Sequence, residues 1–131
     1  MKYLLDTDWI IHHFNDVKSI TEQIEKLNRS DVAMSIISVA ELYEGIYFSK
    51  DPIGSQNMLD EFLSSGIRII DIDTEICRIF GRERSMLRRK HQLIGDFDLL
   101  IASTAIAYNL TLLTNNRKHF ERINGLKIIS L

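Results

Sequence analysis

Carboxylate side chains follow separate apolar runs of the sequence closely enough to form one site. Asp6 and Asp8 come directly after the first run, Glu41 follows the second, and Asp96 and Asp98 open an Ala-rich segment that leads to another. Clustered carboxylates repel one another, so a site built from them needs a positive partner. Because the His residues show no metal-ligand spacing, these hard oxygen ligands suit Mg²⁺ or Mn²⁺. Such an ion can acidify a bound water, which predicts metal-dependent phosphoryl or phosphodiester hydrolysis.

Each of these acids also has a structural interpretation, which stays open at the level of the sequence. Either aspartate of the first pair can N-cap the helix that follows it. Ser38 to Glu41 matches the S-x-x-E capping box, which would make Glu41 structural. Ser38 alone can also cap that helix and leave Glu41 free to face the site. Either acid of the last pair can cap the Ala-rich helix, but one cap cannot use both.

The elements that must position these acids alternate between short apolar runs and longer helical segments. Strands are predicted at 3–5, 32–37, 67–72, 110–113 and 126–129, and helices between them, the first over 9–27 and the second opening at Ser38. Strands made of continuous apolar residues are typical of a parallel sheet covered on both faces. We therefore predict a single three-layer α/β/α domain over residues 1–131, with a mostly parallel sheet of about five strands. In such folds ligands gather at the carboxyl ends of the strands, where the acids fall.

The composition agrees with a globular protein that has a core. The chain of 131 residues is 45% hydrophobic, and its formal net charge of −2 gives no global positive field for a nucleic acid. A single cysteine, Cys77, excludes an internal disulfide and is expected as a small core residue in a reducing compartment. The uncharged stretch from Leu99 to Tyr108 is about half as long as a membrane span requires. We expect a soluble cytoplasmic protein with no membrane partner.

A basic segment precedes the last pair of acids. Its positive charge makes four residues candidate contacts for RNA: Arg84, Arg88, Arg89 and Lys90. Charge runs usually form a solvated helix face. Because this run leads directly into Asp96 and Asp98, it can equally follow a phosphate backbone toward a metal site.

Four ordered blocks of the sequence resemble those of PIN-domain ribonucleases, and most of all the VapC toxins of toxin–antitoxin pairs. The blocks are LLDTD at 4–8, SVAELYEG at 38–45, IGDFDLLIA at 94–102, and LTNN at 113–116 followed by Phe120. A single L-D-T-D would be a weak signal. Four blocks in the right order and spacing, across nearly the whole chain, are a strong one.

The resemblance implies a divalent-metal-dependent endoribonuclease that uses Mg²⁺ or Mn²⁺. It also implies that the protein cuts RNA, is held inactive by a cognate antitoxin and forms a homodimer. The family's three acids fall on Asp6, Glu41 and Asp98, with Asp6 and Asp98 as direct metal ligands and Asp96 as a supporting ligand.

The block after the fourth strand departs from the pattern of the family. The family commonly has a further acid there, whereas this chain has Asn116 and His119. Asp96 is expected to take part of that role. Thr7 and Asn116 are expected as supporting polar residues of the site.

Two functions of other classes remain as alternatives. The Asp6-Thr7-Asp8 sequence also resembles the D-x-D start of haloacid-dehalogenase-like phosphatases, in which Asp6 would be a covalent nucleophile. Those enzymes also need a lysine at a defined position. The lysines nearest to the acids in the sequence are Lys90 and Lys118, and neither clearly occupies that position. The other alternative is a catalytically silent PIN domain that binds RNA or a partner, against which the complete set of acids argues.

The resemblance also predicts an apolar groove near the acids for a segment of the antitoxin. The first and third helices carry more apolar surface than a small core needs, and we expect part of this set to be exposed: Trp9, Ile10, Phe14, Tyr43, Tyr47 and Phe48. A second apolar stripe, formed by Ile76, Ile79 and Phe80, can serve a dimer interface or the core equally.

Overall fold

Five short strands form one sheet through the middle of the molecule, in a computed structural model that describes residues 1–131. The strands are β1 (Tyr3–Leu5), β2 (Val32–Ser35), β3 (Arg68–Ile70), β4 (Thr111–Leu113) and β5 (Ile128–Ile129). The helices are α1 (Thr7–Phe14), α2 (Lys18–Lys26), α3 (Ile36–Phe48), α4 (Pro52–Leu63), α5 (Thr74–Arg89), α6 (Asp96–Ala107) and α7 (Arg117–Phe120), and a 3₁₀ turn, η1 (Arg29–Asp31), precedes β2. Every strand pairing is parallel, which confirms the predicted fold class.

The order of the strands, β3-β2-β1-β4-β5, places β1 at the centre of the sheet. The chain runs outward from β1 through β2 to β3, and then returns to the other side of β1 with β4. Open α/β sheets bind ligands beside such a reversal, at the carboxyl ends of the two strands. The register pairs Leu5 with Leu113, so that the next residues, Asp6 and Thr114, lie at the same edge.

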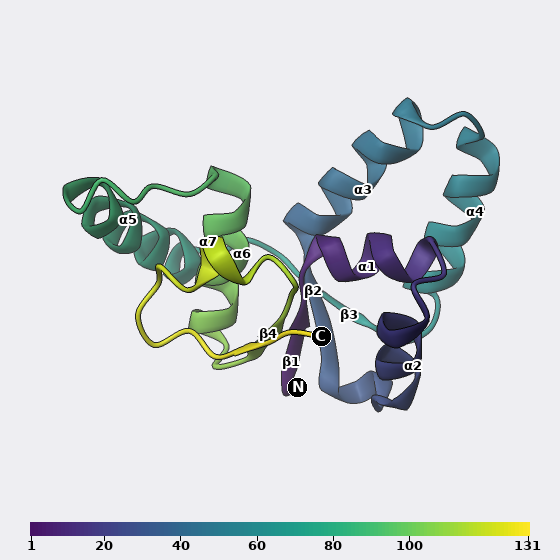
Figure 1. The fold of residues 1–131 in the computed structure, drawn as a ribbon, viewed down its shortest axis with the longest axis horizontal. Coiled ribbons are helices and arrows are strands. Elements are labelled where there is room, and N and C mark those ends of the chain that lie inside the picture. The colour runs from purple at the N-terminus through teal and green to yellow at the C-terminus, as the bar shows by residue number, and fades with distance from the viewer.

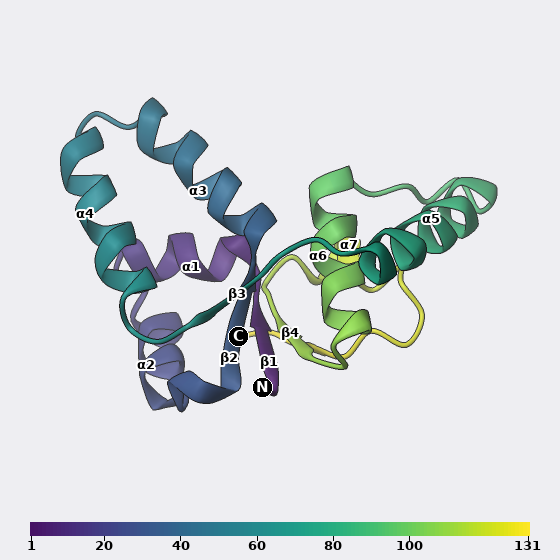
Figure 2. The same ribbon diagram turned by 180° about the vertical axis from the view of Figure 1, so that it is seen from behind.

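Helices cover both faces of the sheet, with α1 to α4 on one side and α5 to α7 on the other (Figures 1 and 2). Successive side chains of a strand point to opposite faces. Leu4 therefore lies in the core beneath α5 and α6, and Leu5 lies in the core beneath α1 to α4. Both leucines are fully buried, so the central strand holds the backbone of Asp6 firmly.

The helix caps differ from those predicted around the second strand. β2 ends two residues earlier than expected, and Ser35 caps α3 by accepting a hydrogen bond from the Ile37 amide at 3.0 Å. Ser38 is buried inside the first turn of that helix. Of the two interpretations left open for Glu41, the capping box with Ser38 is therefore wrong, and Glu41 has no capping role.

The first predicted helix is in fact two helices. Helix α1 ends at Phe14, Asp16 takes a left-handed conformation with φ of 58°, and α2 then begins at Lys18. At the start of the Ala-rich helix, Gly95 occupies the N-cap position of α6. Asp96 is consequently the first residue of α6 and Asp98 the third, so neither aspartate caps the helix.

Two predictions about α5 are settled by burial. Ile76 and Ile79 are buried in the core of this chain, with Phe80 packed against that core, so the stripe serves the core. Cys77 is exposed, so its predicted core position is wrong. The reason is helical phase, because Cys77 lies about 100° around the helix from Ile76. None of the helices has the length and apolar character needed to span a membrane.

Candidate active site at the carboxyl edge of the sheet

Asp6 is the most deeply buried acid of the site, with only 3% of its surface exposed. It follows β1 directly and caps α1, where its Oδ1 accepts a hydrogen bond from the Thr7 amide at 2.9 Å. Its Oδ2 accepts a hydrogen bond from the hydroxyl of Thr114 at 2.7 Å. The capping and site interpretations of Asp6 are thus compatible, because one oxygen faces the helix and the other faces the end of β4.

Thr114 joins the ends of β1 and β4. Besides Asp6, its Oγ1 lies 3.3 Å from Oδ1 of Asp8, so its single proton is shared between two carboxylates and lies closer to Asp6. The same oxygen accepts a hydrogen bond from the Asn116 amide at 2.9 Å, and Asp8 accepts one from the Asn115 amide at 3.1 Å. The sequence patterns place Thr114 in the LTNN block but assign it no role in the site, although a polar residue at the end of the strand beside β1 was the available signal.

Glu41 reaches the same edge from α3. Its Oε1 lies 2.7 Å from the hydroxyl of Thr7, and that hydroxyl also lies 2.8 Å from the hydroxyl of Ser38. Because an ionised carboxylate can only accept, Thr7 donates its one proton to Glu41. Thr7 thereby orients Glu41, which agrees with the supporting role expected for it.

Asp98 comes from the first turn of α6 and is half-buried. The amide nitrogen Nδ2 of Asn116 lies 3.4 Å from its Oδ2, and Nδ1 of His119 lies 3.6 Å from the same oxygen. Nδ2 of Asn116 and Nδ1 of His119 are 3.1 Å apart. The two residues that stand where the family commonly has a further acid therefore contact Asp98.

The electrostatics show that the acids influence one another. Burial, helped by the charges of Asp8 and Asp98, raises the pKa of Asp6 to about 8 against the opposing hydrogen bond from Thr114. Burial also raises the pKa of Glu41, with a contribution from the charge of Asp98. The pKa of Asp98 is raised by burial and by Asp8, while His119 lowers it. The acid after β1 and those on α1, α3 and α6 thus influence one another within a single negative site.

The donor set of this site fits a hard divalent cation, although the side chains are not closed around one. No three His, Cys, Asp or Glu side chains are arranged to hold an ion as they stand. The available donors, from Asp6, Glu41 and Asp98, are carboxylate oxygens, which Mg²⁺ and Mn²⁺ prefer. A cation would also relieve the mutual repulsion that raises the pKa values of these acids.

Asp96 lies apart from these acids. Its side chain is 63% exposed and its Oδ1 accepts a hydrogen bond from Nε of Arg84 on α5 at 3.1 Å. Residues two positions apart in a helix, such as Asp96 and Asp98, are separated by about 200° around its axis. With α6 beginning at Asp96, that residue faces α5 and Asp98 faces the ends of β1 and β4.

The other basic residues singled out in the sequence lie at the end of α5. Arg88, Arg89 and Lys90 are exposed, and Arg84 is half-buried by its pairing with Asp96. Arg84 and Arg88 line a surface cleft of about 250 Å³ together with Gly81 and Ser85. The basic segment is therefore not contiguous with the buried acids but lies on the other side of the first turn of α6.

An apolar groove reaches the site from the opposite side. Five apolar residues of α1, α3 and α4 line this groove of about 260 Å³, and Glu41 lies at its polar edge: Ile11, Phe14, Leu42, Ile46 and Met58. Trp9 and Ile10 are core residues, whereas Tyr47 and Phe48 at the end of α3 are 78% and 93% exposed. The prediction that part of this set remains exposed is confirmed, and of the six residues Phe14 lines the groove beside Glu41.

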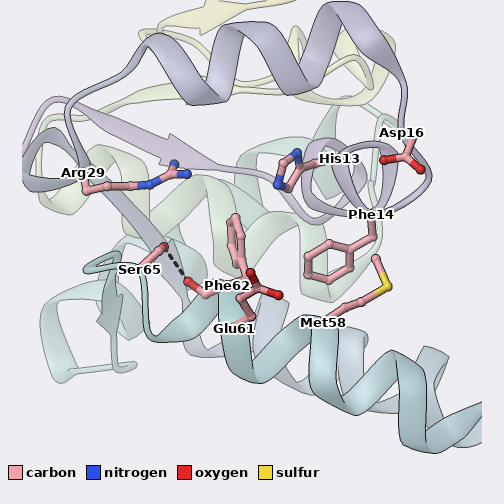
Figure 3. Close-up of a pocket in the computed structure, with 8 residues that line it drawn as sticks. All are labelled: His13, Phe14, Asp16, Arg29, Met58, Glu61, Phe62 and Ser65. Carbon is pink, nitrogen blue, oxygen red and sulfur yellow. Dashed lines mark hydrogen bonds between the residues drawn. The ribbon is translucent and has the colours of Figure 1, made fainter.

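A second cavity of about 270 Å³ adjoins the groove and shares Phe14 and Met58 with it (Figure 3). The rings of Phe14 and Phe62 meet edge to face with centroids 5.5 Å apart, and His13 packs against both. Arg29 lines the cavity from η1. The two hollows together follow α4 along its length.

Comparison with known proteins identifies the family. The sequence matches the PIN domain over residues 3–126. The chain belongs to the PIN-domain family. Ribonuclease VapC2 of Rickettsia felis is 41% identical over 128 residues, which cover 96% of this chain and 95% of that protein. The tRNA(fMet)-specific endonuclease VapC of Salmonella typhimurium is 31% identical over 128 residues, covering 98% and 96%. Within the PIN family, the chain is thus a member of the VapC group.

Solved structures agree with this assignment. The VapBC2 crystal structure from Rickettsia felis, bound to a DNA fragment from its promoter, superposes with a TM-score of 0.91 at 39% identity, covering 100% of this chain and 99% of that one. A DNA-bound VapBC structure from Salmonella typhimurium gives a TM-score of 0.90 at 33% identity, covering 99% and 98%. The resemblance drawn from the four sequence blocks is confirmed, and the full-length match favours the PIN-domain nuclease over the phosphatase alternative.

Proposed function

We propose that this PIN-domain protein is a divalent-metal-dependent endoribonuclease and the toxin of a toxin–antitoxin pair, acting in the cytoplasm. The observation that carries the proposal is the convergence of Asp6, Glu41 and Asp98 from three separate segments at the switch point of the sheet. Relatives across the full length of the chain are named ribonucleases and endonucleases. A structural role explains the capping by Asp6, but it does not explain three mutually repelling carboxylates at one edge.

Asp6 and Asp98 are the residues we assign to hold the cation directly, with Glu41 completing the site or orienting the attacking water. A bound Mg²⁺ or Mn²⁺ supplies the positive charge that acidifies water and stabilises a phosphodiester during hydrolysis. Thr114 holds Asp6, Thr7 holds Glu41 and Asn116 contacts Asp98, so each carboxylate has a partner that limits its motion. This second set of contacts is what keeps three acids oriented for a shared task.

The nature of the products distinguishes this mechanism from attack by the 2′-hydroxyl of the RNA. Attack by that hydroxyl needs a base and an acid, and His119 is the only His or Lys side chain that contacts the acids of the site. Attack by water leaves 5′-phosphate and 3′-hydroxyl ends. The test is incubation of the purified chain with a tRNA mixture that contains initiator tRNA, with Mg²⁺, with Mn²⁺ and with EDTA. Cleavage that persists in EDTA and yields 2′,3′-cyclic phosphate would contradict the proposal, and phosphate trapped on Asp6 by acid quench would favour a phosphatase.

The partner proposal rests on the apolar groove. The Rickettsia felis and Salmonella typhimurium structures are VapBC complexes. We assign the groove between α1, α3 and α4 to a segment of a cognate antitoxin, because it is apolar, accessible and bordered by Glu41. The homodimer implied by the family remains a proposal, to be tested by the solution mass of the isolated chain.

The groove can be tested with one substitution on α4 and a matched control. Met58→Glu places a charge in the groove, so RNA cleavage should escape inhibition by a cognate antitoxin. Ile53→Glu adds the same charge to an exposed position of α4 outside the groove, so inhibition should persist. Equal inhibition of both variants would move the antitoxin to another surface.

A further inference from the structure

The cleft on α5 has a composition unlike that of the other hollows. It has a volume of about 250 Å³ and no apolar lining residue. Its lining residues are one or two turns apart on a single helix face, at positions i, i+3, i+4 and i+7: Gly81, Arg84, Ser85 and Arg88. Two guanidinium groups and a hydroxyl thus border an open space that offers nothing to an apolar ligand.

Gly81 creates this space at a cost to the helix. It lies inside α5, where glycine destabilises a helix by about 1 kcal/mol relative to alanine. Apart from its chain neighbours and the backbone of α5 itself, a Cβ atom placed on Gly81 would meet no atom within 4 Å. No contact within the chain therefore requires glycine at this position, and the space beside it is open to a ligand from outside.

Arg84 is fixed in place while its end remains available. Its Nε donates to Asp96, and its two terminal nitrogens make no hydrogen bond within the chain. Its side chain is 32% exposed. A guanidinium that is held through Nε presents its remaining N–H groups in a fixed direction, which suits the planar recognition of a phosphate.

The cleft and the acids are connected by the first turn of α6. Asp96 faces α5 and pairs with Arg84, and Asp98 faces the acids on the other side of the same turn. Helices α5 and α6 lie side by side in both views (Figures 1 and 2). A strand with one phosphodiester at the acids can therefore cross this turn and bring another phosphate to α5.

We propose that Gly81, Arg84, Ser85 and Arg88 form a subsite for a backbone phosphate of the nucleic acid strand, separate from the phosphodiester that is cut. This inference rests on the proposed nuclease function and adds the residues that position the strand. Arg84 and Arg88 contribute charge and Gly81 contributes space. Asp96 is a positioning residue, because it acts through Arg84.

The first test is the affinity for RNA, measured by fluorescence anisotropy with a labelled uridine oligonucleotide. The full chain carries Asp98→Asn throughout to prevent cleavage. Arg88→Gln should weaken binding about fivefold at about 0.1 M salt and flatten the salt dependence by about 0.7, the values for one phosphate contact on a single strand. The matched control, Lys26→Gln, removes the same charge from α2 on the opposite side of the sheet and should leave both quantities unchanged.

The second test separates the subsite from a merely solvated helix face. Gly81→Leu fills the cleft, so it should weaken RNA binding at least as much as Arg88→Gln does. The same substitution raises helix propensity, so the thermal midpoint should hold or rise. Gly81→Ala should fall between the wild type and the leucine variant in affinity. A loss of binding together with a gain in stability cannot come from misfolding.

The outcomes distinguish this inference from the nuclease proposal. If Arg88→Gln and Gly81→Leu both bind RNA as tightly as the Asp98→Asn reference, the subsite is wrong. Cleavage by the unsubstituted chain would still support the nuclease. Weaker binding in both variants, without any cleavage by the parent chain, would support a strand-binding cleft and overturn the nuclease. If inorganic phosphate occupies the cleft and the oligonucleotide does not compete with it, the ligand is a free anion and the inference of a strand subsite is wrong.

Discussion

The first turn of α6 separates two charged regions that differ in almost every physical respect. On one side, Asp98 joins buried carboxylates whose mutual repulsion only His119 opposes, and the pKa values of three acids are raised. On the other side, Asp96 makes an exposed ion pair with Arg84 beside further free arginine side chains. Charges that are buried together interact strongly, whereas exposed pairs are screened by water. Substitutions in the first region should therefore have large effects on chemistry, and substitutions in the second should have small, salt-dependent effects on binding.

The largest effect is expected for Asp98→Asn. The substitution keeps the shape of the side chain but removes a ligand charge, so RNA cleavage should fall by about a hundredfold or more. The thermal midpoint should hold or rise, because one of the mutually repelling carboxylates is gone. Steady-state cleavage and a thermal melt of the same preparation test both parts. Retention of cleavage within about threefold would remove Asp98 from the site.

Glu41→Gln should give the next largest loss of cleavage. Thr7 can still donate to the amide oxygen, so the fold around α3 is kept while the charge is lost. We expect a loss of at least about tenfold with an unchanged thermal midpoint. Ser35→Ala is the matched control on the same helix, because it removes the true cap and should cost about 1 kcal/mol of stability without a comparable loss of cleavage. The reverse pattern would return Glu41 to a structural role.

The pH dependence of stability tests the burial of Asp6 without any activity measurement. The pKa of this carboxyl is about 8 in the folded chain, against an ordinary value of 3.8. Between those values the folded state binds more protons than the unfolded state, so stability without a divalent ion should fall as pH rises from about 4 to about 8. The loss should be on the order of a few kcal/mol, since each pKa unit corresponds to about 1.4 kcal/mol.

Two further measurements make this prediction specific to Asp6. Asp6→Asn should flatten the profile, because the amide does not titrate. Mg²⁺ or Mn²⁺ should raise the thermal midpoint of the parent chain more at pH 8 than at pH 5, because the ion binds the ionised form. Parallel profiles for the parent chain and Asp6→Asn would show that this carboxyl is not held in its protonated form.

The contrast also shows what the sequence could and could not predict. The position of Asp6 was predictable because parallel strands end at one edge, and Asp6 directly follows a buried apolar run. The different directions of Asp96 and Asp98 were not predictable. They depend on which residue begins α6, and the sequence allowed either aspartate to be the cap. The prediction that Cys77 is buried failed for the same reason, since one step around a helix moves a residue from the core to the surface.

Long-range contacts were the other part that sequence patterns could not supply. The hydroxyl of Thr114 reaches Asp6 across 108 positions of the chain, and Asn116 reaches Asp98 across 18. Periodicity identifies the faces of an element but not the side chain opposite it in space. Asn116 was nevertheless placed among the supporting residues through the family resemblance, whereas Thr114 was passed over.

The smallest effect, and the finest test of the contrast, is expected for Asp96. Asp96→Asn retains an oxygen that can accept from Nε of Arg84 but removes a negative charge beside the α5 cleft. Cleavage should stay within about fivefold of the parent, because an exposed ion pair contributes at most about 1 kcal/mol. RNA binding should be equal or tighter, because the local field becomes more positive.

Asp96→Ala removes the same negative charge and also the oxygen that accepts from Arg84. The local field then favours RNA as much as in Asp96→Asn, but Arg84 is no longer held in place. Weaker binding in the alanine variant than in the asparagine variant, with both affinities measured on the Asp98→Asn background, would isolate the positioning of Arg84. A collapse of cleavage in Asp96→Asn comparable to that of Asp98→Asn would instead place Asp96 among the metal ligands, where the sequence first suggested it.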